Sequence, residues 1–189
     1  DAFTNNTLSP EEALMRSSAF NMLNTRYFIV NPTAAPLYNP YALGNAWFVK
    51  DYRIVNNADE EIAALTDLKP ESIAVIDKRF EKNLMGFSKS ASIEGAIELT
   101  SYSPNHLVYQ STSNQDGLAV FSEIYYDKGW KAFIDGKEMP HFRANFILRA
   151  MIVPAGEHKI EFKFQPDSFY TGQNISLAAS LILILLLVG

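Results

Sequence analysis

The chain has 189 residues, of which 48% are hydrophobic, enough for one or two domains with their own cores. Its formal net charge is -5 and its Lys and Arg residues are scattered, which excludes the basic surface expected of a nucleic-acid-binding protein. The absence of cysteine excludes disulfide bonds, thiolate metal sites and a cysteine nucleophile.

The first part of the chain is predicted to begin with a helix. Ser9 is a suitable cap, and Glu12 completes a capping box for a helix over Pro10–Leu23. Aromatic and β-branched residues then predict three strands, over Arg26–Val30, Ala46–Val55 and Ser72–Ile76. The stretch Asn31–Asn45 is predicted to be a loop, because its prolines would interrupt a helix.

A second helix is predicted between the last two strands, over Asn57–Leu68. Asn57 is the expected cap, and Glu60 completes the capping box. Ile62 and Leu65 are expected to form the apolar face of this helix. The acidic residues at its start are explained as favourable charge near a helix N-terminus, so they are not predicted to be a catalytic pair.

The sequence pattern changes at about residue 92. Residues 1–91 are predicted to form a mixed α/β part, whereas in 92–168 strand-like runs alternate with turn signals every 8 to 12 residues or so, as in an antiparallel β-sandwich. In "KIEFKF", Ile160 and Phe162 alternate with charged residues, which predicts a sheet with one wet face. The run "LAVFSEIYY" is apolar on both faces and is predicted to be central. The expected fold class is therefore α+β.

The C-terminal run "ISLAASLILILLLVG", residues 175–189, has no charged residue. It is shorter than the roughly 20 residues that cross a hydrocarbon core. It also lacks the polar face of a surface helix, so we expect the start of a transmembrane helix in a piece of a larger membrane protein. The alternative is a buried C-terminal helix or strand.

The sequence offers no pattern typical of a catalytic or metal site. His106, His141 and His158 have no partner at metal-pair spacing and are expected to be solvated turn residues. The motifs of nucleotide-binding loops and of serine hydrolases do not occur. We therefore expect no catalytic residue, no metal and no cofactor in this chain.

Aromatic residues provide the first candidates for ligand binding. Tyr125, Tyr126 and Trp130 could stack on the faces of sugar rings, as could Phe133. The same rings could instead pack in or at the rim of the sandwich, with polar tips reaching water. They could also form an interfacial aromatic belt near a membrane. The residue types alone are compatible with all three roles.

Glu123 is the acidic residue of most interest, because it lies in the predicted central strand and a buried carboxylate needs a partner. Arg143 and Arg149 are the candidate partners, and Glu123 and Arg143 are included among the candidate ligand-binding residues. Asp135 precedes Gly136, and this pair is the preferred sequence of a two-residue hairpin turn, so a catalytic role for Asp135 is not predicted.

Several short motifs follow one another between Ser122 and Ser176. They are a Tyr-Tyr…Gly-Trp element, a "DGK" turn, an "RAN…LRA" strand, the sequence "VPAGEH", and "PDSF…G…IS" leading into the apolar tail. With this succession the chain resembles the YfhO-like bacterial membrane proteins. The upstream runs "MLNTRYFIV" and "NAWFVKDYRIV" resemble the same family less specifically.

Members of that family look like multi-spanning proteins related to polyprenyl-phosphate-sugar-dependent glycosyltransferases, some of them implicated in adding sugars to cell-envelope polymers. The resemblance implies an extracytoplasmic domain of a bacterial membrane protein, followed by a last transmembrane helix. It implies the lipid bilayer as a partner, with a glycan or lipid-linked sugar as a second one. It carries over no catalytic residue, because the acidic residue thought to act in such enzymes lies in the membrane part.

Three functions are consistent with these observations. The first is an accessory domain that positions an acceptor polymer or lipid-linked sugar for a glycosyltransferase-like membrane protein. The second is a structural or carbohydrate-binding envelope module without transferase activity. The third is a freestanding hydrolase, which would depend on Glu123.

Overall fold

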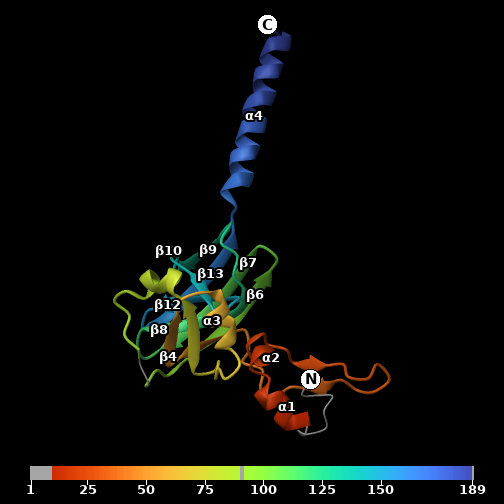
Figure 1. Ribbon diagram of the computed structural model, residues 1–189. Coiled ribbons are helices and arrows are strands. Elements are labelled where there is room, and N and C mark those ends of the chain that lie inside the picture. The colour runs from red at the N-terminus through yellow and green to blue at the C-terminus, as the bar shows by residue number, and fades with distance from the viewer. Residues whose placement is uncertain (1–9, 90–91, 189) are drawn as a thin grey trace.

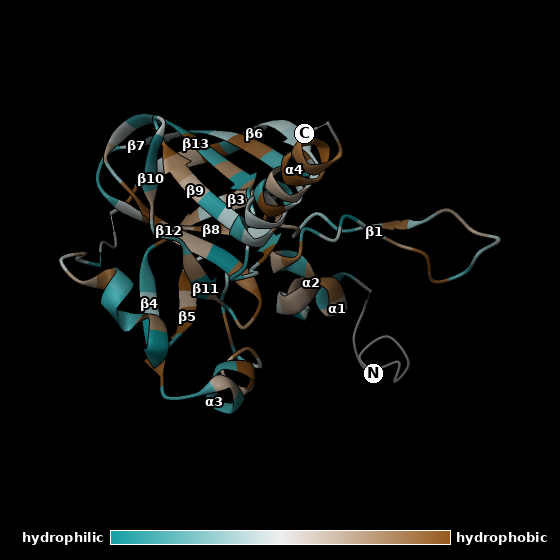
Figure 2. Ribbon diagram, turned by 90° about the horizontal axis from the view of Figure 1, so that it is seen from above, coloured by the Kyte–Doolittle hydropathy of each residue, from teal (hydrophilic) through white to brown (hydrophobic). Residues whose placement is uncertain are grey.

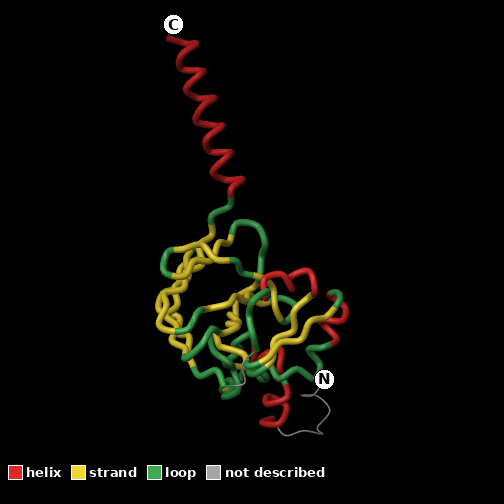
Figure 3. Tube along the Cα trace, turned by 90° about the vertical axis from the view of Figure 1, so that its left-hand side faces the viewer, coloured by secondary structure: helices red, strands yellow, loops and turns green. Residues whose placement is uncertain are grey.

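The computed structural model describes residues 10–89 and 92–188. Figure 1 shows a sheet-rich body from which one long helix, α4 (Asp167–Val188), extends at the C-terminal end. The strands pair mostly antiparallel, and short helices cover part of the body, so the α+β prediction is confirmed. Figure 3 shows the same division between the strand-rich body and the projecting helix from the side.

The body contains a sandwich of two antiparallel sheets. The larger sheet has the strand order β10-β9-β13-β7-β6. Its strands are β6 (Gly95–Ser103), β7 (His106–Ser113), β9 (Trp130–Ile134), β10 (Lys137–Met139) and β13 (Gly156–Phe164). The smaller sheet has the order β11-β12-β8-β3. Its strands are β3 (Ala46–Val49), β8 (Gly117–Ile124), β11 (Phe142–Ala144) and β12 (Leu148–Val153).

Three aromatic rings form the centre of the core between the two sheets. Tyr109, Phe121 and Phe162 contact one another edge to face, with ring centroids 4.9 to 6.1 Å apart. All three are fully buried, and Ile160 is buried with them, as the alternating pattern of β13 predicted. The opposite face of this strand is less exposed than predicted, because Glu161 is only 6% exposed. Edge-to-face pairs of this kind add about 0.5–1.5 kcal/mol each beyond the burial of apolar area.

A parallel α/β unit covers the outer face of the smaller sheet. It consists of β4 (Asp51–Val55), α3 (Ala58–Ala63), β5 (Ile73–Asp77) and the 3₁₀ helix η1 (Lys78–Leu84). Leu118 and Val120 of β8 pack in this second core, while Ala119 and Phe121 face the first. β8 is therefore apolar on both faces because it lies between two cores, and its predicted central position is confirmed.

The first predicted helix is broken in two. The structure has α1 (Pro10–Arg16) and α2 (Ser18–Met22), and Ser17 between them donates its hydroxyl hydrogen to the Ala13 carbonyl at 2.6 Å. Such a side-chain bond competes with the backbone bonds of a helix. The predicted capping residue Ser9 lies outside the described residues.

One strand prediction and the loop prediction also need correction. The run Ala46–Val55 is divided at Lys50, so that β3 joins the sandwich and β4 joins the α/β unit. The predicted loop contains the short strand β2 (Leu37–Tyr38), which pairs with β1 (Tyr27–Phe28).

The second predicted helix is capped as expected, but the side chain that it buries differs from the prediction. The Asn57 side chain accepts a hydrogen bond from the Glu60 amide at 2.9 Å, which confirms the cap. The helix α3 ends at Ala63, and its predicted apolar residue Ile62 is 50% exposed. Glu61 is fully buried instead. The prediction was therefore wrong for Ile62, because it did not include the partners of the Glu61 carboxylate. Leu65, just beyond the end of α3, does pack against the apolar core as predicted.

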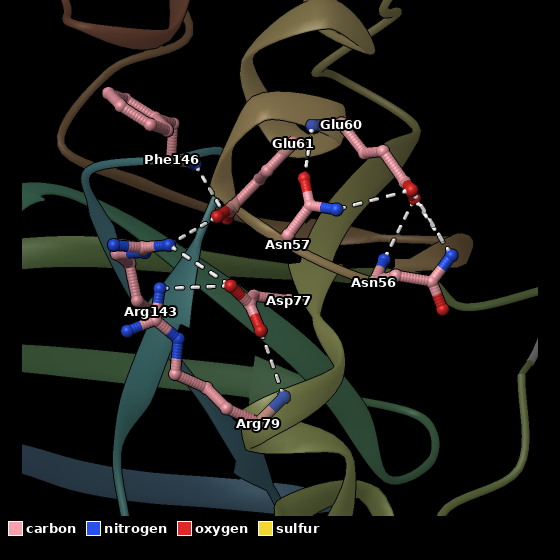
Figure 4. A network of polar contacts seen from close by, with 8 residues as sticks. All are labelled: Asn56, Asn57, Glu60, Glu61, Asp77, Arg79, Arg143 and Phe146. Carbon is pink, nitrogen blue, oxygen red and sulfur yellow. Dashed lines mark hydrogen bonds and ion pairs between the residues drawn. The ribbon is translucent and has the colours of Figure 1, made fainter.

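Those partners lie in β11 and in the turn that connects it to β12. The Glu61 carboxylate accepts one hydrogen bond from the Arg143 guanidinium and another from the Phe146 amide at 2.9 Å (Figure 4). Asn145 continues the connection with two hydrogen bonds to Val75, both 2.8 Å long. The backbone N–H of Asn145 donates to the Val75 carbonyl, and the side-chain oxygen of Asn145 accepts from the backbone N–H of Val75. This turn therefore joins the sandwich to the α/β unit.

The turn needs these bonds because its backbone is unusual. Asn145 and Phe146 have φ values of 50° and 72°, in the left-handed region that residues with a Cβ adopt at a cost. The hairpin turn between β9 and β10 shows the easier version of this geometry. There Asp135 and Gly136 have φ values of 49° and 81°, which confirms the predicted two-residue turn.

The C-terminal helix begins earlier than predicted, at Asp167 and not at Ile175. Over Asp167–Leu187 it has the length and apolar composition needed to cross a membrane. Apolar residues dominate the half of α4 that is farther from the body, as Figure 2 shows in a view from above, roughly along this helix. Only Gln165 and Pro166 separate it from β13, and the Gln165 amide donates to the Gly129 carbonyl.

Replacing Glu61 by alanine would leave the Arg143 guanidinium and the Phe146 amide without their acceptor in a nearly closed site. We expect the free energy of unfolding to fall by about 3–5 kcal/mol, as for other broken buried ion pairs. Urea denaturation of the full chain in detergent would measure this loss. The matched control is Asp59→Asn on the exposed side of the same helix, which should change stability by less than about 0.5 kcal/mol. Equal losses in the two variants would contradict this role of Glu61.

Candidate functional site

Three hollows surround the segment Tyr125–Gly129, which connects β8 to β9. Each of the five candidate ligand-binding residues lines at least one of them. The Arg143 pocket, of about 500 Å³, is lined by Arg79, Phe80, Tyr125, Arg143 and Phe146, among others. The Arg149 pocket, of about 410 Å³, is lined by Pro104, Asn105, Glu123, Ile124, Tyr126, Trp130, Arg149 and Phe164. The third hollow, of about 540 Å³, includes Tyr125, Trp130 and His141.

Arg143 is held by carboxylates. Besides Glu61, its guanidinium lies 3.7 Å from Asp77, which also forms a 2.9 Å ion pair with Arg79 (Figure 4). Burial raises the pKa of Asp77, but its hydrogen bonds with Arg79 and the charge of Arg143 outweigh burial and lower it. Arg143 is therefore not the partner of Glu123, contrary to one of our two expectations, and its charge is largely neutralised.

Tyr125 and His141 form part of an aromatic cluster with edge-to-face and tilted ring contacts. The Tyr125 ring lies 5.6 Å from Phe80 and 5.6 Å from His141, and His141 also contacts Phe162. Burial lowers the pKa of His141 to about 4, so its imidazole is neutral near pH 7. The expectation of a solvated turn residue was wrong for His141, because it packs behind the segment that carries Tyr125.

Trp130 has little free ring surface for stacking on a sugar. The Arg149 guanidinium lies over it, 4.0 Å from the ring centroid, and the Phe164 ring contacts it at 5.4 Å. Phe133 is similarly covered by the Lys163 ammonium at 4.9 Å. Tyr126 is 51% exposed and has the most accessible ring among the three candidate ligand-binding aromatics.

Glu123 and Arg149 line the same pocket. Burial raises the pKa of Glu123, and the nearby positive charge of Arg149 partly opposes that shift. The two side chains form no ion pair within 4 Å among the described residues. Arg149 is only 3% exposed, and its Nε donates to the Ile124 carbonyl at 3.0 Å. Of the two partners that the sequence suggested for Glu123, Arg149 therefore lines the same pocket and Arg143 does not.

The other two histidines contact carboxylates across the larger sheet. His106 Nε2 lies 2.8 Å from Glu161, which two lysines also approach. His158 Nδ1 lies 2.6 Å from Asp135, and its Nε2 lies 3.0 Å from the Ala155 carbonyl. They belong to separate ion-pair clusters. Across residues 10–89 and 92–188, no group of three or more His, Asp or Glu side chains is arranged to hold a metal ion.

Comparison with known proteins gives one match. A family model described as bacterial membrane protein YfhO matches residues 78–176, which include the 3₁₀ helix η1, strands β6 to β13 and the first half of α4. No curated protein and no solved structure matches the chain.

The contact between Asp135 and His158 is expected to stabilise the β9–β10 hairpin only within a limited range of pH. The hydrogen bond with Asp135 raises the pKa of His158. The stabilisation that protonated His158 gives the folded state is therefore fully present below about pH 6.5 and is lost as pH rises through the raised pKa. The same bond lowers the pKa of Asp135. The stabilisation that the Asp135 carboxylate gives the folded state is therefore present above about pH 3.9 and is lost as pH falls through the lowered pKa.

We therefore expect the stability difference between the wild-type chain and His158→Gln to be largest between about pH 4 and 6.5. Because both side chains are partly exposed to solvent, the difference should stay below about 1 kcal/mol. Thermal unfolding of both proteins at a series of pH values measures it. A difference that does not vary with pH would contradict the assignment.

Proposed function

The chain belongs to the family of the bacterial membrane protein YfhO, and on this premise we propose that it is the extracytoplasmic accessory domain of a multi-spanning membrane protein. The parent protein resembles polyprenyl-phosphate-sugar-dependent glycosyltransferases and acts in the glycosylation of cell-envelope polymers. The domain holds an acceptor polymer or a lipid-linked sugar beside a catalytic site formed elsewhere in the parent protein.

The observation that carries this proposal is the position of the pockets relative to α4. Phe164 lines the Arg149 pocket and ends β13, three residues before α4 begins at Asp167. Three residues span at most about 10 Å. A molecule held in that pocket, or in the Arg143 pocket that shares Ile124 and Tyr126 with it, would therefore lie close to the membrane surface, where a lipid-linked sugar presents its head group.

A second candidate function is a carbohydrate-binding or structural envelope module without transferase activity. The half-exposed ring of Tyr126 at the mouth of two pockets favours it. In this case Tyr126, and not the covered Trp130, would provide the stacking surface, with Tyr125 and Arg143 in the adjoining pocket wall.

The orientation of the domain can be tested with a cysteine introduced into it, because this chain has none of its own and any cysteines elsewhere in the parent protein can be replaced first. Lys128→Cys places the thiol in the exposed loop between β8 and β9. We expect a membrane-impermeant maleimide to label it in intact cells, or in spheroplasts where an outer membrane is present. A cysteine on a known cytoplasmic loop of another protein serves as the control. Labelling of Lys128→Cys only after lysis would place the domain on the cytoplasmic side.

The proposed role predicts a change in the cell envelope when the parent gene is deleted. The sugar content of purified envelope polymers should fall, and the intact gene should restore it. A gene in which only the part encoding residues 10–166 is deleted should restore less, provided that its product reaches the membrane in normal amounts. Unchanged sugar content after complete deletion, together with measurable binding of envelope glycans by the chain, would favour the second function.

A further inference from the structure

The Arg149 pocket is built around an irregularity in the smaller sheet. Leu148 pairs with Ile124, but the next residue of β12, Arg149, pairs with Phe121. Ser122 and Glu123 therefore have no partner in β12, and β8 bulges at this point. Bulges of this kind re-aim side chains and are frequent beside functional sites. Here the bulge places Glu123 in the pocket wall, and the Arg149 Nε binds the carbonyl of Ile124.

The Arg149 guanidinium has an unmet hydrogen-bonding requirement. Its Nη1 is buried and has no partner among the described residues. The rings of Trp130 and Phe162, 4.0 and 5.2 Å from the guanidinium carbon, interact with its positive charge but accept no conventional hydrogen bond. A buried donor without an acceptor is costly and uncommon in native structures. An anionic group that reaches the guanidinium through a small movement of the pocket side chains would satisfy it.

The pocket is at the depth of lipid head groups. The 21 residues Asp167–Leu187 form a helix about 31 Å long, which matches a hydrocarbon core of about 30 Å. Asp167 then lies at the membrane surface, and the pocket residue Phe164 lies within about 10 Å of it along the chain. Trp130 and Tyr126 beside it are the residue types that favour the membrane–water interface.

We propose that the Arg149 pocket binds the phosphodiester head group of a phospholipid from the membrane that contains α4. The Arg149 guanidinium donates hydrogen bonds to the phosphate oxygens, for which its planar group of donors is well suited. Glu123, which is not engaged in an ion pair with Arg149, accepts a hydrogen bond from a hydroxyl or amine of the head group. Ile124 and Phe164 contact the glycerol and upper acyl carbons. This inference depends on membrane anchoring by α4 and not on glycosyltransferase activity.

Native mass spectrometry of the full chain in detergent, titrated with phosphatidylglycerol, tests the proposal. We expect one phospholipid to bind in preference to further ones. Arg149→Gln should weaken this binding about tenfold to a hundredfold, as expected for the loss of a charged hydrogen-bond donor. Ile124→Glu should weaken it similarly by adding a negative charge at the mouth of the pocket. Ile124 is 55% exposed, so this variant still tests the site if Arg149→Gln does not fold.

Two controls distinguish a specific site from general attraction. Lys128→Gln removes an exposed positive charge from the neighbouring loop and should change the dissociation constant less than about threefold. A galactosyl diacylglycerol with the same acyl chains, which has no phosphate, should bind the wild-type chain at least about tenfold more weakly than phosphatidylglycerol. Equal binding of the two lipids, or equal binding of phosphatidylglycerol by Ile124→Glu and the wild type, would overturn the proposal.

Discussion

The buried carboxylate of Glu61 is the interaction on which the arrangement of the two layers depends. It lies on α3, outside the sandwich, and it accepts hydrogen bonds from Arg143 of β11 and from Phe146 of the β11–β12 turn. Two residues of this turn, Asn145 and Phe146, have positive φ values, and such bonds offset the cost of that conformation. Asn145 also binds the edge of β5. The α/β unit and the sandwich are thus joined by polar bonds as well as by the apolar core that they share.

Local sequence rules predicted the parts of the fold whose causes are local. The Asn57 cap, the Asp135–Gly136 turn and the alternation of Ile160 with charged residues all depend on residues that are near in sequence. The orientation of α3 depends on partners 82 and 85 residues from Glu61, which no helical periodicity contains. Ile62 is exposed for this reason, although it was the more apolar choice for the buried face.

The contacts of the candidate site were likewise predictable only where they involve residues that are near in sequence. The sequence identified the stretch around Tyr125 and Trp130, and opposite charge suggested two arginines for Glu123. Choosing between them required the strand register, because Arg149 lies across the bulge of β8 while Arg143 faces α3. Nothing in the sequence indicated that Trp130 would be covered by the guanidinium, since Arg149 is 19 residues away and reaches it across the sandwich, from β12 of the smaller sheet to β9 of the larger one. The family motif containing Trp130 is therefore better explained by packing at the base of α4 than by an open stacking surface.

The short connection between β13 and α4 also has a mechanical consequence. β13 is the middle strand of the five-stranded sheet and pairs with β7 on one side and β9 on the other. A pull on α4 along the axis of β13 therefore loads both ladders in shear, so that many hydrogen bonds must break at once instead of one after another. An edge strand in the same position would peel away under much smaller forces. A domain attached in this way can bear tension applied through α4 without losing its fold.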